Sequence, residues 1–328
     1  MKIRSSSTRT RTFNASSKAK YALLALATLC LARSALPDAQ FKFLPKNAKC
    51  TVTSFDRPAL EKPVDPMKFG AKCDGTTDDT AAFQRAMDAG DVLVPARTCV
   101  IAHTVTIKAS NRRMECRPGA MLKRNVSGEH TMFLYEAGRG LLMNNSIVGC
   151  TFEGANSEKP VVDWDAPGHW DIPVQTTDNV SNFLLAGNTF RQFFGQSMFQ
   201  TLGGNGGSGD RIVFNTFENC PLYGPVFVGH QNGYVGYNKA ISCTVGVEND
   251  HDTDNTGGNV FECNQITTNQ SEAKLTGGVY GVGANYSGNT VRYNTITGEH
   301  SWLLIKHQEK GRDAKYLDNQ CGGGCRVQ

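Results

Sequence analysis

Short apolar runs separated by Gly, Asn and Ser turns follow one another after residue 140, with almost no helical periodicity. A short text recurs among them, in which an apolar residue usually stands two places after an asparagine. A period of this length indicates stacked supersecondary units, each too small to bury a core of its own. The recurring asparagines are Asn188, Asn215, Asn238, Asn264, Asn294 and Asn319, at intervals of 27, 23, 26, 30 and 25 residues, and Cys150 occupies the same column upstream.

Each repeat is predicted to hold three short strands in one coil. In the coil of Asn215 the predicted strands are 211–214, 216–220 and 225–230. Stacked coils of this kind build parallel sheets with strands about 4.8 Å apart, and the inward residues form a continuous apolar core. The asparagine column falls at the tight turn between the first two strands. There we expect it to tolerate left-handed backbone and to hydrogen-bond the next asparagine along the stack.

One helix is predicted before the coils, over residues 78–89. Phe83, Ala86 and Met87 lie at helical spacing and form one apolar stripe, Gly90 ends it, and Thr77 or Asp78 is expected to cap its start. Because a solenoid needs end caps, the helix is expected to cover the N-terminal end. Short β-type runs follow it at 92–95, 100–101, 105–107 and 120–122.

The first 34 residues differ in character from the rest. They contain seven basic residues and no acidic one, and their apolar run at 21–31 is shorter than the roughly 20 residues that span a bilayer. These features predict a secretory signal peptide at 1–34, and hence a secreted protein, extracellular or periplasmic, with no stable membrane insertion. A lead-in segment is expected at 35–65 and one β-helix domain at 66–328, with its cap at 66–95 and its coils at about 96–320.

Removing the leader changes the charge of the chain. The full sequence has a formal net charge of +4, but without the seven leader residues 27 basic and 30 acidic residues remain. The charge therefore gives no reason to expect nucleic acid as a partner. Ten of the 11 cysteines remain, an even number that permits disulfides in an exported chain. Cys220 and Cys243 are expected to stack in neighbouring turns, and the glycines between Cys321 and Cys325 would allow a small ring.

The segment 69–83 resembles the opening motif of the pectate lyase superfamily, with Cys73 where glycine is usual, and 92–95 resembles the strand that follows it. The resemblance spans roughly residues 66–320. It implies an all-β fold, the right-handed parallel β-helix, and an acidic polysaccharide as the partner. It does not fix the chemistry, because the superfamily also contains hydrolases, epimerases and phage tailspikes. Residues 229–231 do not match the polygalacturonase motif, and 249–252 have a weak similarity to a C5-epimerase signature.

In this superfamily the substrate cleft usually lies over the sheet that we assign to the third strand of each coil. The stacked text aligns the runs 197–203, 225–231, 246–252, 279–285 and 302–308. Period two then places Glu248 and Asp250 on the outer face, with Gly281 and Gly283 beside them as a bare floor for a sugar. Lys306 stands two coils beyond Asp250, roughly 10 Å away by strand spacing. A further column holds three histidines, of which His230 is predicted to bind the substrate and His251 and His307 are catalytic candidates.

These residue types suit a lyase that cleaves a uronate polymer by β-elimination. Such an enzyme needs a base, for which Lys306 or a histidine is the candidate, and positive charge to stabilise an enolate. Glu248, Asp250 and Asp252 are candidates to hold Ca²⁺. Trp164 and Trp170, in the longest gap between repeats, suit stacking on sugar faces.

Other interpretations remain open at this point. The histidines also fit a polar ladder at a turn, the acids a solvated turn, Lys306 a surface lysine and the two tryptophans a loop pinned to the sheet. The same candidate residues suit a C5-epimerase. An inverting glycoside hydrolase would need carboxylates about 6.5–9.5 Å apart. A non-catalytic carbohydrate-binding or tailspike-like module is the alternative from another class, and the oligomeric state is not predicted.

Overall fold

A computed structural model gives the structure of the chain. The chain divides into two units, Met1–Phe43 and Leu44–Gln328. All described residues belong to the second unit, and the first, which includes the predicted signal peptide, contains none of them. The described residues are 50–52, 55, 59–125, 131–155, 171–193, 197–201, 207–219, 226–243, 245–251, 257–268, 277–283, 288–298, 304–305, 314–322 and 324–325.

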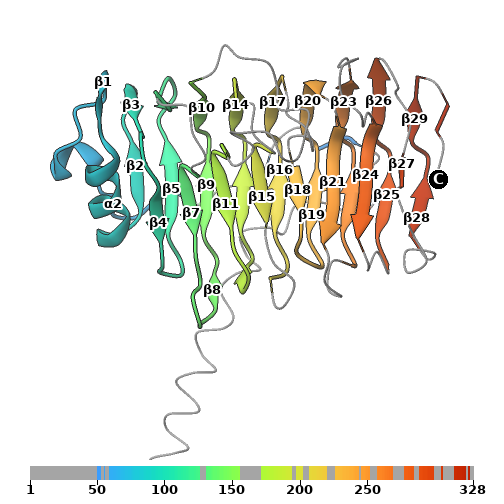
Figure 1. Cartoon of the computed structure of the whole chain (residues 1–328), viewed down its shortest axis with the longest axis horizontal. Helices are drawn as coiled ribbons and strands as arrows, with labels where there is room; N and C mark the ends of the chain where they lie inside the picture. The colour runs from blue at the N-terminus through green and yellow to red at the C-terminus, as the bar shows by residue number, and fades with distance from the viewer. Residues whose placement is uncertain are drawn as a thin grey trace, which may run out of the picture. The chain divides into compact units, whose positions relative to one another are not determined.

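Three parallel sheets run along the stack of coils (Figure 1). The nine-stranded sheet contains β2 (Val92–Val94), β5 (Arg113–Cys116), β9 (Ser146–Val148), β13 (Leu184–Ala186), β16 (Arg211–Val213), β19 (Tyr234–Gly236), β22 (Val260–Glu262), β25 (Thr290–Arg292) and β28 (Lys315–Leu317). The ten-stranded sheet contains β1 (Asp74–Asp78), β3 (Thr98–Val100), β6 (Met121–Lys123), β10 (Thr151–Glu153), β14 (Thr189–Arg191), β17 (Thr216–Glu218), β20 (Lys239–Cys243), β23 (Gln265–Thr268), β26 (Thr295–Gly298) and β29 (Gln320–Cys321). The eight-stranded sheet contains β4 (Val105–Ile107), β7 (Phe133–Tyr135), β11 (Val174–Thr176), β15 (Phe199–Thr201), β18 (Val226–Val228), β21 (Val245–His251), β24 (Gly277–Gly283) and β27 (Leu304–Ile305), and a further pair is formed by β8 (Leu142–Met143) and β12 (Val180–Ser181).

The three-stranded coil is confirmed. The predicted strands of the Asn215 coil correspond to β16, β17 and β18, one in each sheet. In-register pairing stacks identical inward side chains: the ring of Phe190 lies 4.7 Å from that of Phe152 and 5.1 Å from that of Phe217, both nearly parallel. Such columns fill the interior with one continuous apolar core. The architecture is the predicted parallel β-helix.

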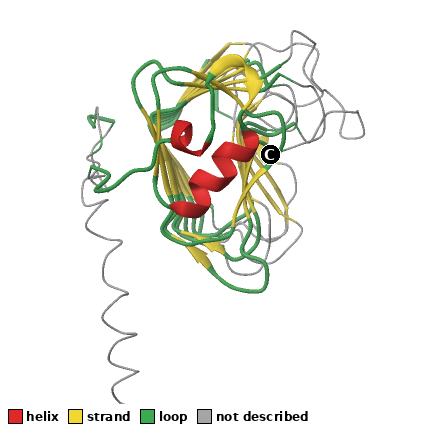
Figure 2. Cartoon of the chain, turned by 90° about the vertical axis from the view of Figure 1, so that its left-hand side faces the viewer, coloured by secondary structure: helices red, strands yellow, loops and turns green. Residues whose placement is uncertain are grey.

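The predicted helix caps the N-terminal end of the solenoid. It is α2 (Thr80–Ala89), preceded by a short 3₁₀ turn, η2 (Pro66–Phe69), and it lies across the end of the coils (Figure 2). Phe83, Ala86 and Met87 are fully buried, as their spacing predicted, and the Phe83 ring packs edge-on against Phe133, 6.4 Å between centroids. The helix therefore closes the first coil's apolar interior from water.

The start of the helix differs from the prediction. The capping position is Asp79, not Thr77 or Asp78. The Asp79 carboxylate bonds away from the helix, accepting the backbone N–H groups of Lys72, Cys73 and Val100. Asp78 still serves the first turn, because its Oδ1 accepts the Thr80 N–H at 3.0 Å. Partial burial raises the pKa of Asp78, but the hydrogen bonds from Thr80 outweigh it and the net pKa is lowered.

The asparagine ladder is continuous from Asn188 to Asn319. Each side-chain oxygen accepts both the backbone N–H and the amide Nδ2 of the asparagine one coil earlier, at distances of 2.9–3.1 Å. We predicted that the asparagine itself would adopt left-handed backbone. In the structure the residue before each asparagine does so instead. The asparagine backbone is therefore free to begin the next strand. The left-handed positions are Gly149, Gly187, Phe214, Tyr237, Cys263, Tyr293 and Asp318.

Replacing Asn238 by alanine is expected to lower the free energy of unfolding by about 3 kcal/mol, because buried groups lose their partners. The Asn238 side chain is buried, accepts from Asn215 and donates to the Ile212 carbonyl at 2.8 Å and to Asn264 at 3.0 Å. Urea denaturation would measure the change. The matched control is Asn319→Ala at the half-buried end of the ladder, where water replaces the lost bonds and about 1 kcal/mol is expected. If both replacements lowered the free energy of unfolding equally, burial of the asparagine would not determine how much it stabilises the fold.

Disulfides join neighbouring turns of the chain. Cys73 pairs with Cys99, Cys116 pairs with Cys150, and the predicted small ring between Cys321 and Cys325 is confirmed. Cys73 adopts left-handed backbone, φ 45°, which accounts for glycine being usual at this position of the motif. Cys243 is also disulfide-bonded, and Cys220, its expected neighbour, lies outside the described residues.

Two described residues of the lead-in segment, Cys50 and Phe55, contact the ladder turns. We call residues 50–55 the strap; positions 50–52 and 55 are described. Cys50 forms a disulfide with Cys263, and the Phe55 ring stacks on Phe214 with 5.6 Å between centroids. Phe214 stacks in turn on Tyr237 at 5.1 Å. The strap thus contacts the left-handed residues that precede successive ladder asparagines. No helix in the described ranges has the length and apolar character to cross a membrane.

Candidate functional site

The predicted carboxylates lie on β21, one of the two longest strands of the eight-stranded sheet. Val247 and Asn249 are buried, 3% and 2% exposed. Since successive residues of a strand face opposite sides, the positions of Glu248 and Asp250 belong to the outer face of the sheet. The roles of Glu248, Asp250 and His251 stay predictions. The other predicted residues of this region, Lys306, His307, Asp252, Trp164 and Trp170, lie outside the described residues.

The register between β21 and β24 differs by one residue from the expected alignment. Glu248 pairs with Tyr280 and Asp250 with Val282, whereas Gly281 pairs with the buried Asn249. Gly283 pairs with His251. The two glycines therefore do not stand beside the carboxylate positions as a bare floor, and that part of the prediction is wrong.

The register of β21 on its other side, against β18, is the expected one: Phe227 pairs with Glu248 and Val228 with Asn249. The expected alignment matched apolar residues with apolar residues in neighbouring coils. Asn249 occupies an inward position, where its amide donates to the Val228 carbonyl at 2.9 Å and its oxygen accepts from Asn289 at 2.6 Å. A buried amide is tolerated where its hydrogen bonds are made, so these bonds fasten β21 to β18 and to the turn before β25.

The observed register defines one row across the outer face of the eight-stranded sheet, which we call the outer row. It brings carboxamide, aromatic and carboxylate residues into line where a glycine floor was expected. Saccharides are bound by such residues, because aromatic rings pack on sugar faces and amides or carboxylates bind hydroxyl groups. The outer row contains Gln175, Gln200, Phe227, Glu248, Tyr280 and Leu304.

His230 does not bind substrate in the way we predicted, because its side chain is buried. It is 1% exposed, and its Nδ1 lies 2.6 Å from Oδ2 of Asp210, which is also buried. Its backbone N–H donates to Thr201 Oγ1 at 3.2 Å. The alternative reading, a polar residue bonded at a turn, describes this histidine.

His230 is bonded to a second polar ladder, which was not predicted from the sequence: its ring contacts Asp210, and its carbonyl accepts from the Asn259 amide at 3.0 Å. The ladder's members immediately precede strands of the nine-stranded sheet, and each side-chain oxygen accepts a backbone N–H from the preceding coil. Each member stands five residues before the asparagine column, a constant offset that is visible in the sequence. Through the Asn289–Asn249 bond this ladder supports the strand that carries the predicted carboxylates. The members are Asn145, Asp210, Asn259 and Asn289.

Two further charged clusters also escaped prediction. Glu262 accepts from the Tyr234 hydroxyl at 2.6 Å and from Arg292 Nε at 2.5 Å. Burial first, and then the bond and charge of Glu262, raise the pKa of Tyr234. Arg124 and Asp171 form a fully buried ion pair. Both clusters join residues far apart in sequence, so no local motif announces them.

One group of described residues has the geometry to hold a metal ion. The cluster that brings suitable atoms together is Cys73, Asp79 and Cys99, but both sulfurs are bonded to each other in a disulfide. A thiolate is the form of cysteine that binds metals, so this cluster is structural. The assignment of Ca²⁺ to Glu248, Asp250 and Asp252 stays a prediction.

Comparisons with known proteins agree on the architecture. No protein-family profile and no curated protein sequence matches the chain. Among solved structures, PfbA, a surface adhesin of Streptococcus pneumoniae, is 14% identical over 79% of each chain, with a TM-score of 0.53. The mannuronan C-5 epimerase AlgE4 A-module of Azotobacter vinelandii is 14% identical over 78% of this chain and 76% of that one, with a TM-score of 0.41. The tailspike protein of Acinetobacter baumannii phage AM24 is 14% identical over 80% of this chain and 51% of that one, with a TM-score of 0.48. At these identities the likeness concerns the fold, and the chain is a parallel β-helix protein, as its opening motif implied.

Proposed function

We propose that this chain binds an acidic polysaccharide along the outer row and cleaves it by β-elimination. The observation that carries the proposal is the alternation in β21. Buried Val247 and Asn249 assign the positions of Glu248 and Asp250 to one outer face. Two carboxylate residues one pleat apart, beside the aromatic residues of the outer row, are a suitable basis for binding a charged sugar chain and acting on it.

The chemistry needs two kinds of group. A base removes the proton from C5, the carbon next to the uronate carboxylate, and the electron pair then expels the glycosidic oxygen from the adjacent carbon C4. A C4–C5 double bond forms, and the departing oxygen takes up a proton from an acid or from water. Lys306, His251 and His307 are the candidate bases. Glu248, Asp250 and Asp252 would hold Ca²⁺, which binds carboxylate oxygens and would supply positive charge beside the substrate's carboxylate.

The test is the ultraviolet absorbance of the unsaturated product, followed while the full chain is incubated with a panel of uronate polymers. We expect absorbance to rise with at least one polymer, faster with Ca²⁺ and slower with a chelator. New reducing ends without absorbance would indicate hydrolysis and overturn the lyase proposal. Exchange of the ring proton with deuterated water, without chain cleavage, would indicate epimerisation instead.

A non-catalytic carbohydrate-binding module is the second candidate. It is favoured by the likeness in fold to PfbA, a bacterial surface adhesin. Binding of a polysaccharide with neither cleavage nor proton exchange would support this candidate. The two functions share the outer row as the ligand surface and differ in whether a base acts there.

A further inference from the structure

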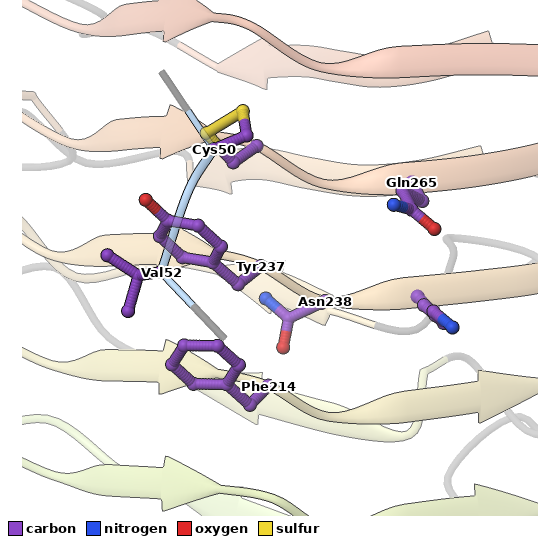
Figure 3. A pocket seen from close by; sticks show the side chains of 8 residues that line it. Cys50, Val52, Phe214, Tyr237, Asn238 and Gln265 are labelled. Carbon is purple, nitrogen blue, oxygen red and sulfur yellow. A yellow bond between two sulfur atoms is a disulfide. The ribbon is translucent and has the colours of Figure 1, made fainter. Parts of the chain in front are cut away.

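A pocket lies between the strap and the ladder turns, at the junction of the nine- and ten-stranded sheets. It has a volume of about 360 Å³, within the range of small-ligand sites. Figure 3 shows Val52 of the strap beside the Tyr237 ring, with the Cys50 disulfide at one end and Gln265 on the far side. Because β20 and β23 belong to the ten-stranded sheet, the pocket is separate from the outer row.

Aromatic residues occupy positions where the backbone favours glycine. Phe214 and Tyr237 have φ of 56° and 58°, a left-handed conformation that bulky residues rarely adopt. In earlier coils Gly149 and Gly187 take the same position. The Phe55 ring of the strap lies over both kinds of turn, within van der Waals distance of the space beside Gly187 and stacked on Phe214. The nearly parallel rings of Phe55, Phe214 and Tyr237 form one stack at the spacing of the coils.

Polar groups complete the opposite side of the pocket. Lys239 and Gln265 are the first residues of β20 and β23, they pair in register, and both are exposed. No ion pair joins Lys239 to another described residue. Asn238 contributes only a wall, because its amide is engaged in the ladder. Burial first, and then the charge of Glu262, raise the pKa of Tyr237, so its hydroxyl stays protonated and can donate.

We propose that this pocket binds one or two units of a negatively charged saccharide. The sugar face packs on the Tyr237 ring, the carboxylate or sulfate lies at Lys239, and Gln265 bonds the hydroxyl groups. The strap forms the remaining wall through Val52 and the Cys50 disulfide. This site goes beyond the proposed activity, because it needs neither Glu248 nor Asp250 and does not depend on catalysis.

The experiment is an NMR titration of the oxidised full chain, following the Val52 methyl groups and the Gln265 side-chain amide. The probes are a uronic acid disaccharide, a sulfated disaccharide and the neutral disaccharide. We expect both signals to shift with one or both charged probes, and at least threefold weaker binding of the neutral one; comparing the two charged probes identifies the anionic group. No shift with either charged probe, or equal binding of the neutral one, would overturn the proposal.

Variants test the residues. Lys239→Gln is expected to weaken binding of the charged probe about threefold to fivefold, as for an exposed ion pair. Tyr237→Phe retains the ring and should bind nearly as well as the native chain, whereas Tyr237→Ala, at the same strained backbone position, should not bind. Lys123→Gln on β6 of the same sheet is the matched control and should change nothing. Unchanged binding in both Lys239→Gln and Tyr237→Ala would contradict the site.

The outcome can be separated from that of the proposed lyase. The pocket signals should respond to the probe equally in Glu248→Gln and Asp250→Asn chains. If these variants lose product formation while the pocket signals still respond, both the lyase proposal and the saccharide pocket are supported. An absent pocket response with normal product formation would remove the second site alone.

Discussion

Replacing both Cys50 and Cys263 by serine is expected to lower the free energy of unfolding by about 5 kcal/mol, the largest stability effect we predict for a single cross-link. The bond joins residues 213 apart in sequence, so it removes much of the conformational freedom of the unfolded chain. The native state also loses the anchor that holds Phe55 against Phe214. Equilibrium denaturation in urea, under oxidising conditions, would measure the change.

The chain contains its own control for this experiment. Cys321 and Cys325 close a ring across a separation of only 4 residues, so the same double replacement there should cost about 2 kcal/mol. Both pairs are solvent-accessible at one cysteine, which makes the chemistry of the replacements comparable. If removal of the Cys50 bond destabilised the chain no more than removal of the small ring, the strap would not contribute to global stability.

Asp250→Asn and Glu248→Gln are each expected to reduce the rate of unsaturated product formation at least about a hundredfold, with unfolding unchanged. Both replacements keep the size of the side chain and remove its charge. If the carboxylates act by holding Ca²⁺, excess Ca²⁺ should partly restore the rate of the single variants. Lys306→Ala, which removes a candidate base, should abolish turnover without rescue by Ca²⁺.

The matched control is Glu218→Gln on β17, a carboxylate on the ten-stranded sheet. It should leave the rate of product formation unchanged. A normal rate in the Asp250→Asn and Glu248→Gln chains would exclude β21 as the catalytic strand. A normal rate in Lys306→Ala would remove only that residue from the mechanism.

The sequence predicted the coil because its signals are local. An apolar residue two places after each ladder asparagine corresponds to a buried position such as Phe190 or Phe217, and the helical stripe of Phe83 needs only its own spacing. Turn residues between the short runs set the strand boundaries to within a few residues. The same pattern of asparagine, apolar and turn residues recurs in each coil, so a few residue types were enough to predict the architecture.

The register of the eight-stranded sheet could not be predicted in the same way. In β21 the inward position of Asn249 is polar, and the partners of this residue lie 21 and 40 residues away. Hydrophobic matching aligned Tyr280 and Val282 with the inward positions of β21, whereas Val279 and Gly281 pair with them, and the expected glycine floor was wrong for that reason. His230 was misplaced because its burial depends on Asp210, in the stretch between two strands. The positions of Glu248 and Asp250 are assigned by alternation along β21 itself, and their roles stay predictions.

The disulfide of the strap has a consequence for how the chain matures. Cys50 is synthesised long before Cys263, and Cys73, Cys99, Cys116, Cys150, Cys220 and Cys243 are made in between. The turns on which the strap rests exist only after several coils have stacked. Cys50 must therefore wait, or exchange an early partner for its final one, which requires thiol–disulfide reshuffling. The first described residue of the polypeptide is thus held in place by one of its last coils, and oxidative maturation cannot follow the order of synthesis.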